Sequence, residues 1–246
     1  MNAMTLSRRV GLIAAFAITW AFATTGTVQA HEPVELRRIL IFGGSGQLGA
    51  EIAKELAGDG HYVHVFVRPS SDRSRLVGQP VEWVVGNVLV EEDVKRALQA
   101  QRYAIVINAL GRSESGVEFY ATSGRWIAKW AKATGVKQVV LHSSVGVGKS
   151  AAAYPADRLG AMRALFVAKE SAERDVIESG ITYTIIRNAV LRDLPAGARS
   201  SAKLYEDETK FGAVSRRGLA QLTAECIDSD VCANKIFHAV DEGMTF

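Results

Sequence analysis

A glycine-rich segment between a strand-like run and a helix-like run constrains this chain more than any other feature. Residues 38–42 (RILIF) form a short apolar run typical of a buried strand. Residues 47–57 place apolar side chains at helical spacing. The motifs G-x-x-G-x-x-G and G-x-G-x-x-G are both satisfied there, by Gly43, Gly44, Gly46 and Gly49. Because strand, loop and helix follow in the order of a dinucleotide fingerprint, we favour a cofactor loop over a plain connecting turn.

This glycine loop has the residue types that a pyrophosphate site needs. Its first glycines permit a tight turn with unusual dihedral angles. Gly46 lets backbone N–H groups approach a phosphate at the positive end of the helix. Gly49 lets the helix and the strand pack closely. We therefore expect cofactor contacts from Gly43, Ser45, Gly46, Gln47, Leu48 and Gly49.

Strand-like and helix-like runs alternate through the rest of the chain. Strands are expected at residues 62–67, 81–85, 103–110, 138–143, 181–187 and 235–240. Helices are expected at residues 90–99, 117–134, 159–179 and 218–227, and a polar loop at 192–212. This alternation predicts an α/β fold, a Rossmann-like doubly wound parallel sheet with a small C-terminal substrate-side region. We expect residues 31–246 to form a single domain.

The residue after the second expected strand bears on the choice of cofactor. An acidic residue near this position binds the ribose 2′-hydroxyl of NAD. Here the residue is Arg68, 19 positions after Gly49, and an arginine suits a 2′-phosphate through a bidentate, charge-assisted contact. The neighbouring Arg73 and Arg75 offer further positive charge. We therefore expect NADP rather than NAD, with a solvated surface arginine as the alternative.

Several short elements match one enzyme family at the right intervals. Gly86-Asn87-Val88 matches an adenine-contacting element, with Asn87 where Asp is usual, and Ala109-Leu110-Gly111 matches a turn along the cofactor. Ser143-Ser144, Lys169-x-x-x-Glu173 and the run 179–187 match a serine pair, a helix and a sixth strand. Over residues 37–245 the chain thus resembles the atypical short-chain dehydrogenases/reductases of the NAD(P)H-binding, NmrA-like group. The resemblance implies cofactor contacts at Asn87, Val88, Ala109, Leu110, Gly111 and Lys169.

One departure from that family limits the chemistry that the resemblance implies. Standard members use Tyr-x-x-x-Lys, in which the lysine lowers the pKa of a proton-relaying tyrosine. Here Leu165 stands four residues before Lys169. Lys169 is then expected to hold the nicotinamide ribose, with a surface helix charge as the alternative. Other candidates to assist catalysis are Ser143, Ser144 and Tyr154. A loop-packing role is the more common one for such a tyrosine, and His142 is expected to be a hydrogen-bonded strand histidine.

Two functions remain open from these residues. The first is an NADPH-dependent oxidoreductase that passes hydride to a small organic acceptor such as a carbonyl, an activated alkene, a quinone or a flavin. The second is a non-catalytic NADP-binding protein that senses redox state or assists assembly, which Leu165 favours. The chain is expected to act as a monomer or a homodimer.

Residues 1–30 read as an export signal. Arg8 and Arg9 precede an apolar run at residues 11–23, and Val28-Gln29-Ala30 is a small-x-small cleavage site. The arginine pair partly resembles a twin-arginine signal, which would carry a folded protein with its cofactor. We expect an exported protein, periplasmic if bacterial. The alternative is a membrane anchor formed by an uncleaved segment. Soluble NADPH is not expected outside the cytoplasm, so the predicted export conflicts with the predicted cofactor unless the two travel together.

Charge, cysteines and histidines add the remaining limits. The net charge of +3 falls to +1 without residues 1–30, too little to argue for nucleic acid. Cys226 and Cys232 could close a small disulfide loop after export, or remain free thiols in a cytosolic protein. The five histidines form no ligand cluster with the cysteines, so no metal site is expected.

Overall fold

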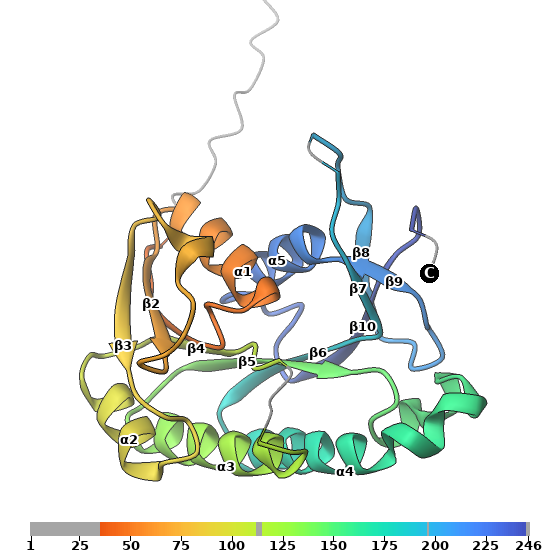
Figure 1. Ribbon diagram of the computed structural model, residues 1–246, viewed down its shortest axis with the longest axis horizontal. Coiled ribbons are helices and arrows are strands. Elements are labelled where there is room, and N and C mark those ends of the chain that lie inside the picture. The colour runs from red at the N-terminus through yellow and green to blue at the C-terminus, as the bar shows by residue number, and fades with distance from the viewer. Residues whose placement is uncertain (1–34, 112–114, 196, 245–246) are drawn as a thin grey trace, which may run out of the picture. The chain divides into compact units, whose positions relative to one another are not determined.

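The computed structural model describes residues 35–111, 115–195 and 197–244. These residues build one eight-stranded sheet and a separate two-stranded sheet (Figure 1). The large sheet is parallel except for its last edge strand, and its order is β3 (Val81–Val85), β2 (Tyr62–Val67), β1 (Arg38–Phe42), β4 (Ile105–Asn108), β5 (Gln138–Ser144), β6 (Thr182–Asn188), β10 (Lys235–Asp241) and β8 (Ala202–Tyr205). The chain reverses direction across the sheet between β3 and β4. This topology confirms the predicted Rossmann-like, doubly wound sheet.

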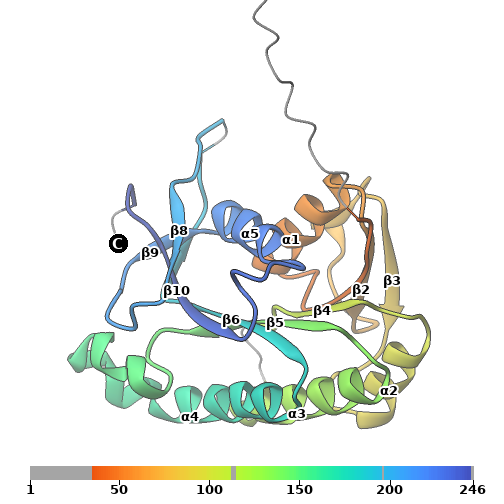
Figure 2. The same ribbon diagram turned by 180° about the vertical axis from the view of Figure 1, so that it is seen from behind.

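Helices cover both faces of the large sheet. α1 (Gln47–Gly58) and α5 (Arg216–Glu225) lie on one face, and α2 (Glu91–Gln99), α3 (Glu118–Ala133) and α4 (Ala156–Glu178) lie on the other (Figures 1 and 2). Two short 3-10 helices, Ser74–Leu76 and Gly148–Ala153, complete the helical segments of the described residues. Because both faces are covered, the central strands carry buried apolar side chains on both faces.

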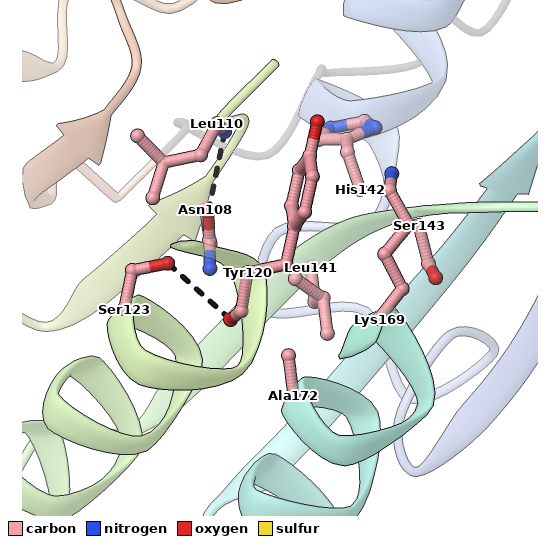
Figure 3. A pocket seen from close by; sticks show the side chains of 9 residues that line it. All are labelled: Asn108, Leu110, Tyr120, Ser123, Leu141, His142, Ser143, Lys169 and Ala172. Carbon is pink, nitrogen blue, oxygen red and sulfur yellow. Dashed lines mark hydrogen bonds between the residues drawn. The ribbon is translucent and has the colours of Figure 1, made fainter. Parts of the chain in front are cut away.

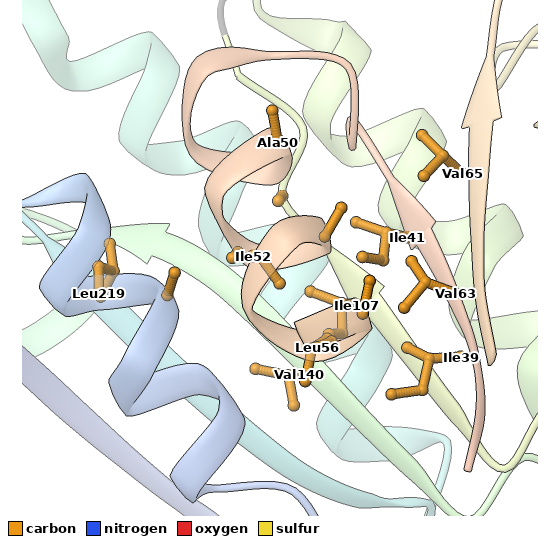
Figure 4. Close-up of a cluster of buried hydrophobic side chains, with 14 of the residues drawn as sticks. Ile39, Ile41, Ala50, Ile52, Leu56, Val63, Val65, Ile107, Val140 and Leu219 are labelled. Carbon is orange, nitrogen blue, oxygen red and sulfur yellow. The ribbon is translucent and has the colours of Figure 1, made fainter. Parts of the chain in front are cut away.

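The core beneath α1 and α5 shows how this covering works (Figure 4). Ile39 and Ile41 of β1 point toward α1, which contributes Ile52 and Leu56, and all four side chains are fully buried. Leu219 brings α5 into the same cluster. Burial of each such side chain contributes about 1.5–3 kcal/mol. This apolar cluster holds β1 and α1 in place and therefore positions the glycine loop that joins them.

Most predicted boundaries agree with the structure, with two informative exceptions. β4 is shorter than the predicted strand at residues 103–110, because Tyr103 and Ala104 belong to the preceding turn. α4 begins at Ala156, three residues before the predicted start, directly after Pro155. Proline suits the first positions of a helix because its missing N–H would have no helical partner there.

The prediction of a polar loop at residues 192–212 is wrong. β8 lies within it and pairs antiparallel with β10, while β7 (Val190–Arg192) pairs with β9 (Ala213–Ser215). β8 is an edge strand, so its outward residues are polar and its pattern resembles a loop. The buried carboxylate of Asp241 on β10 holds its start, because it accepts hydrogen bonds from Ser200 Oγ (2.8 Å) and Ser201 Oγ (2.6 Å).

A disulfide joins Cys226 and Cys232 between α5 and β10. The two carbonyl oxygens of this pair accept hydrogen bonds from Gln138 Nε2 (2.8 Å) and Thr184 Oγ1 (3.0 Å). Both donors lie near the amino ends of their strands. The disulfide therefore braces the edge of the sheet opposite the glycine loop. Residues 1–30, where the export signal is expected, lie outside the described residues, and no helix within the described part is long and apolar enough to span a membrane.

Candidate functional site

The candidate cofactor residues lie at one edge of the large sheet. The glycine loop follows β1, Arg68 follows β2, Asn87 lies just after β3, and Ala109 follows β4. The strands are in register there, since Phe42 of β1 pairs with Phe66 of β2 and with Asn108 of β4. Carboxyl ends of parallel strands near a change of chain direction form the usual crevice for a ligand.

The glycine loop lies directly on the end of β4. Gly43 has a φ of +81°, and a Cβ there would stand 2.6 Å from the carbonyl oxygen of Ala109. Gly46 N donates to Gly43 O at 3.0 Å, which closes the turn. A Cβ on Gly49 would stand 2.3 Å from Gly43 O. The backbone geometry therefore requires glycine at these positions, as the motif predicts.

The N-terminus of α1 fits a phosphate group. Its N-cap, Gly46, has no side chain to accept from the first N–H groups, and the first turn holds no acidic residue. By contrast, the first turn of α2 carries Glu91, Glu92 and Asp93. An uncapped helix start with free N–H groups and a positive end attracts an anion. The structure thus leaves at α1 the position that a cofactor pyrophosphate would take.

Arg68 follows β2, and its exposed side chain forms no ion pair with a described residue. Its backbone N donates to Ser71 Oγ at 3.0 Å. Arg73 lies over the ring of Trp83, 5.0 Å from its centroid, and Arg75 pairs with Asp72 at 3.5 Å. Of the three predicted arginines, Arg68 is thus the one available to a ligand phosphate.

Asn87 and Val88 form the next part of this edge. Asn87 Oδ1 accepts from Leu89 N at 3.0 Å, and its backbone N donates to Asp93 Oδ2 at 2.7 Å. The Asn87 side chain is exposed, while Val88 is buried. The carbonyl oxygen of the Asn87 amide thus shapes the turn, and its NH₂ group, which bonds to no described residue, can face a ligand.

A small pocket lies between the ends of β4 and β5, the N-terminal part of α3 and the middle of α4 (Figure 3). It brings together three predicted site residues, Leu110, Ser143 and Lys169. Ser144 and Tyr154 are not among the lining residues. The lining is Asn108, Leu110, Tyr120, Ser123, Leu141, His142, Ser143, Lys169 and Ala172.

Lys169 enters the pocket from α4. Its ammonium nitrogen lies 4.9 Å from the centroid of the Tyr120 ring, and the side chain is half-buried. Burial lowers the pKa of Lys169 to about 8, against an opposing effect of Glu173. Glu173 itself accepts from Arg187 Nε (3.1 Å) and Nη2 (2.7 Å). Lys169 is therefore not the simple helix-surface charge that the sequence left as an alternative.

Ser143 and His142 occupy opposite faces of β5. Ser143 Oγ is buried without a hydrogen-bond partner among the described residues, so it can serve a ligand. His142 Nε2 lies 3.2 Å from Thr223 Oγ1, which already donates to Leu219 O. Burial, and then the charge of Lys169, lower the pKa of His142 to about 3. His142 is thus the hydrogen-bonded strand histidine that we expected, and it is neutral.

One tyrosine has the role that was the more common expectation, and another was not predicted. Tyr154 packs edge-on against Phe166 and Phe211, with ring centroids 4.9 and 5.6 Å away, which is the loop-packing role. Tyr120 was not predicted, yet it lines the pocket, and its hydroxyl donates to Gly111 O at 2.9 Å. The available signal was its place in the first turn of the helix that follows β4.

Comparison with known proteins gives a family and several relatives. A family model described as NAD(P)H-binding matches residues 43–230. An uncharacterized chloroplast protein of Arabidopsis thaliana is 26% identical over 82% of this chain and 68% of its own. Sanguinarine reductase of Eschscholzia californica is 25% identical over 78% of this chain and 77% of its own.

The solved structure of ChuY, an anaerobillin reductase from Escherichia coli O157:H7, has a similar fold. Its TM-score is 0.74 at 20% identity, with 85% of this chain and 99% of that chain covered. The family match begins at the first glycine of the loop and includes Arg68, the pocket and Arg187. All of the predicted site residues lie within it.

Proposed function

Because the chain belongs to the NAD(P)H-binding family, we propose that it is an NADPH-dependent oxidoreductase that acts on a small organic acceptor. The observation that carries the proposal is the pocket that joins Lys169 and the unpartnered Ser143 hydroxyl at the cofactor edge of the sheet. A relative is named sanguinarine reductase, and the protein of similar fold, ChuY, is named an anaerobillin reductase; the first name supports reductive chemistry.

Different groups of described residues would bind different parts of the cofactor. The glycine loop and the start of α1 would hold the pyrophosphate, because their N–H groups are uncapped. Asn87 and Val88 would contact the adenine, and Ala109, Leu110 and Gly111 would lie along the cofactor. Lys169 would hold the nicotinamide ribose. The bound cofactor supplies the hydride for the reaction.

The preference for NADPH rests on Arg68. Its guanidinium is exposed and without an ion pair in the described part of the chain, and it follows the strand next to the glycine loop. A planar guanidinium binds a phosphate through two parallel N–H bonds, whereas it offers less to an uncharged ribose hydroxyl. This position therefore supports recognition of the 2′-phosphate.

The acceptor site would lie beside the pocket. The Ser143 hydroxyl can donate a hydrogen bond to an acceptor oxygen, and the Lys169 ammonium adds positive charge where negative charge develops. The purified protein should oxidise NADPH in the presence of at least one carbonyl, quinone or flavin. Tight binding of NADPH with no oxidation on any of them would contradict the proposal.

A non-catalytic NADP-binding sensor or assembly factor is the second candidate. Leu165 favours it, because an aliphatic side chain cannot relay a proton at the position before Lys169. Such a protein would bind NADPH and NADP⁺ with different affinities or would change its partner affinity with the cofactor. Binding titrations with both forms separate it from the enzyme.

We also propose that the protein is exported with its cofactor through the segment at residues 1–30. A folded passenger would carry bound NADP to a compartment that lacks the free nucleotide. The N-terminal residue and the bound nucleotide of the native protein test this point. A native chain that keeps its first 30 residues would favour the membrane anchor instead.

A further inference from the structure

We propose that Tyr120 is the proton donor of this pocket, supplied by α3 in place of a tyrosine on α4. Its hydroxyl donates to Gly111 O at 2.9 Å, and the Lys169 ammonium lies 4.9 Å from its ring centroid. Leu165 occupies the α4 position one turn before Lys169. This inference rests on the proposed reductase function, and it names the residue that completes that chemistry.

The close crossing of α3 and α4 explains why Tyr120 reaches Lys169. A Cβ on Gly124 would stand 2.4 Å from Ala172 Cβ, so the two helices touch at these small residues. One turn toward the N-terminus from this contact, α3 presents Tyr120 and α4 presents Lys169. Tyr120 lies in the first turn of α3 and Lys169 in the middle of α4, and both side chains line the pocket (Figure 3).

The first turn of α3 holds the tyrosine in this position. Ser123 Oγ donates to the carbonyl oxygens of Phe119 (2.7 Å) and Tyr120 (3.3 Å). Phe119 packs edge-on against the Tyr120 ring, with centroids 5.4 Å apart. The ring therefore has support from its own helix and from the Lys169 side chain, and the hydroxyl points to the strand edge where Gly111 lies.

The charges around the pair favour loss of the phenol proton. A positive charge near a phenol stabilises the phenolate and lowers the pKa of the phenol. On α4 the nearby carboxylate, Glu173, is bound by Arg187 of β6, so it does not pair directly with Lys169. From β5, His142 is neutral and adds no charge. Among the described residues, Lys169 is thus the positive group in contact with Tyr120.

The reductive step balances with Tyr120 as the acid. The bound cofactor would supply a hydride, which carries two electrons, to the carbonyl carbon of the acceptor. The Tyr120 O–H bond breaks, and its proton bonds to the carbonyl oxygen, which has taken the place of Gly111 O as the phenol's partner. The products are an alcohol and NADP⁺. A proton from water then restores the phenol, and Ser143 Oγ can donate to the same oxygen during the step.

The first test needs no turnover. Tyrosines labelled with ¹³C at Cζ are titrated by NMR in the protein without cofactor, and Tyr120→Phe identifies the Tyr120 signal. We expect its midpoint below the ordinary value of about 10, in a titration coupled to that of Lys169, and we expect Lys169→Met to raise it. A midpoint at or above about 10 in the wild-type protein, or one that ignores Lys169→Met, overturns the role of Tyr120.

The second test measures reduction of a carbonyl acceptor. Tyr120→Phe keeps the ring over which Lys169 lies and should lower kcat by about 10²–10⁴-fold, the range of a lost general acid, with the Kd of NADPH within about threefold. Tyr62→Phe is the matched control, because the Tyr62 ring also faces a cation (Arg38, 5.8 Å) but begins β2 at the opposite edge. The double change Tyr120→Phe and Leu165→Tyr should regain part of the rate.

The two proposals fail in different ways. Unchanged kcat in Tyr120→Phe, with a wild-type protein that turns over, removes the role of Tyr120 and leaves the reductase. A wild-type protein with no turnover on any acceptor removes the reductase, whatever the titration of Tyr120 shows. Loss of kcat in both Tyr120→Phe and the Tyr62→Phe control would indicate general damage and would also overturn the inference.

Discussion

Glu173 on α4 is bound by Arg187 on β6, at 3.1 and 2.7 Å, although it stands one turn after Lys169. Both side chains of the pair are buried, and Arg187 Nη1 also reaches Glu208 at 3.1 Å. The ion pair therefore ties the pocket helix to the central sheet and to the chain after β8. It leaves the Lys169 ammonium against Tyr120.

Arg187→Met should destabilise the protein strongly. The change leaves the buried Glu173 carboxylate without its bidentate partner, and breaking a buried pair costs about 3–5 kcal/mol. Urea unfolding measures the free energy of unfolding. The double change Arg187→Met and Glu173→Met is the control, because it removes both charges and should recover most of the loss. A single-variant loss below about 1 kcal/mol would contradict the account.

Lys169 should make stability depend on alkaline pH. Burial lowers its pKa to about 8, from an ordinary 10.5 in the unfolded chain. Between these values the unfolded chain binds more protons than the folded protein, so the free energy of unfolding rises with pH through this window. The Lys169→Met variant lacks this pH-dependent contribution to the free energy of unfolding. Urea unfolding across pH 7–10 should show wild type gaining stability relative to the variant above about pH 8, and parallel curves would count against the lowered pKa of Lys169.

Gly43→Ala should disrupt the glycine loop. The position has a φ of +81°, and the new Cβ would stand 2.6 Å from Ala109 O. We expect a loss of about 1–3 kcal/mol in stability, from backbone strain, together with loss of NADPH binding. Gly58→Ala at the end of α1 is the matched control, since a Cβ there meets nothing within 4 Å. Equal effects of the two changes would argue against a constrained loop.

Arg68→Ala should weaken NADPH binding far more than NADH binding. Loss of hydrogen bonds to a charged group costs about 1.5–3 kcal/mol, which corresponds to roughly a 10- to 100-fold rise in Kd. Fluorescence titration with both cofactors measures the ratio. Arg75→Ala, which removes a cation already paired with Asp72, should change the ratio little. An equal loss for both cofactors would show that Arg68 does not contact the 2′-phosphate.

The cofactor half of the site could be predicted because each of its parts is encoded over a few neighbouring residues. The turn at Gly43, the uncapped start of α1 and the arginine after β2 each follow from local sequence. The parallel topology then brings their strand ends to one edge without further information. The strand boundaries of β1, β2 and β3 were likewise predicted to the residue.

The acceptor half could not be predicted in this way. Tyr120 meets Lys169 because Gly124 and Ala172 let two helices cross closely, a contact between residues far apart in the chain. Tyr154, one of the candidates to assist catalysis, packs edge-on against two phenylalanine rings, the loop-packing role that was the more common expectation. β8 was missed because an edge strand needs an apolar pattern on one face alone. The local sequence placed Tyr120 in the first turn after β4, but it gave no signal for the contact with Lys169.

The measurement that tests the central claim most directly is NADPH oxidation by the purified protein with a panel of carbonyls, quinones and flavins. We predict saturable oxidation with at least one acceptor, slower with NADH, and reduced by Lys169→Met at saturating cofactor. Tight NADPH binding without oxidation on every acceptor would contradict the assignment as an oxidoreductase and would favour a cofactor-binding sensor.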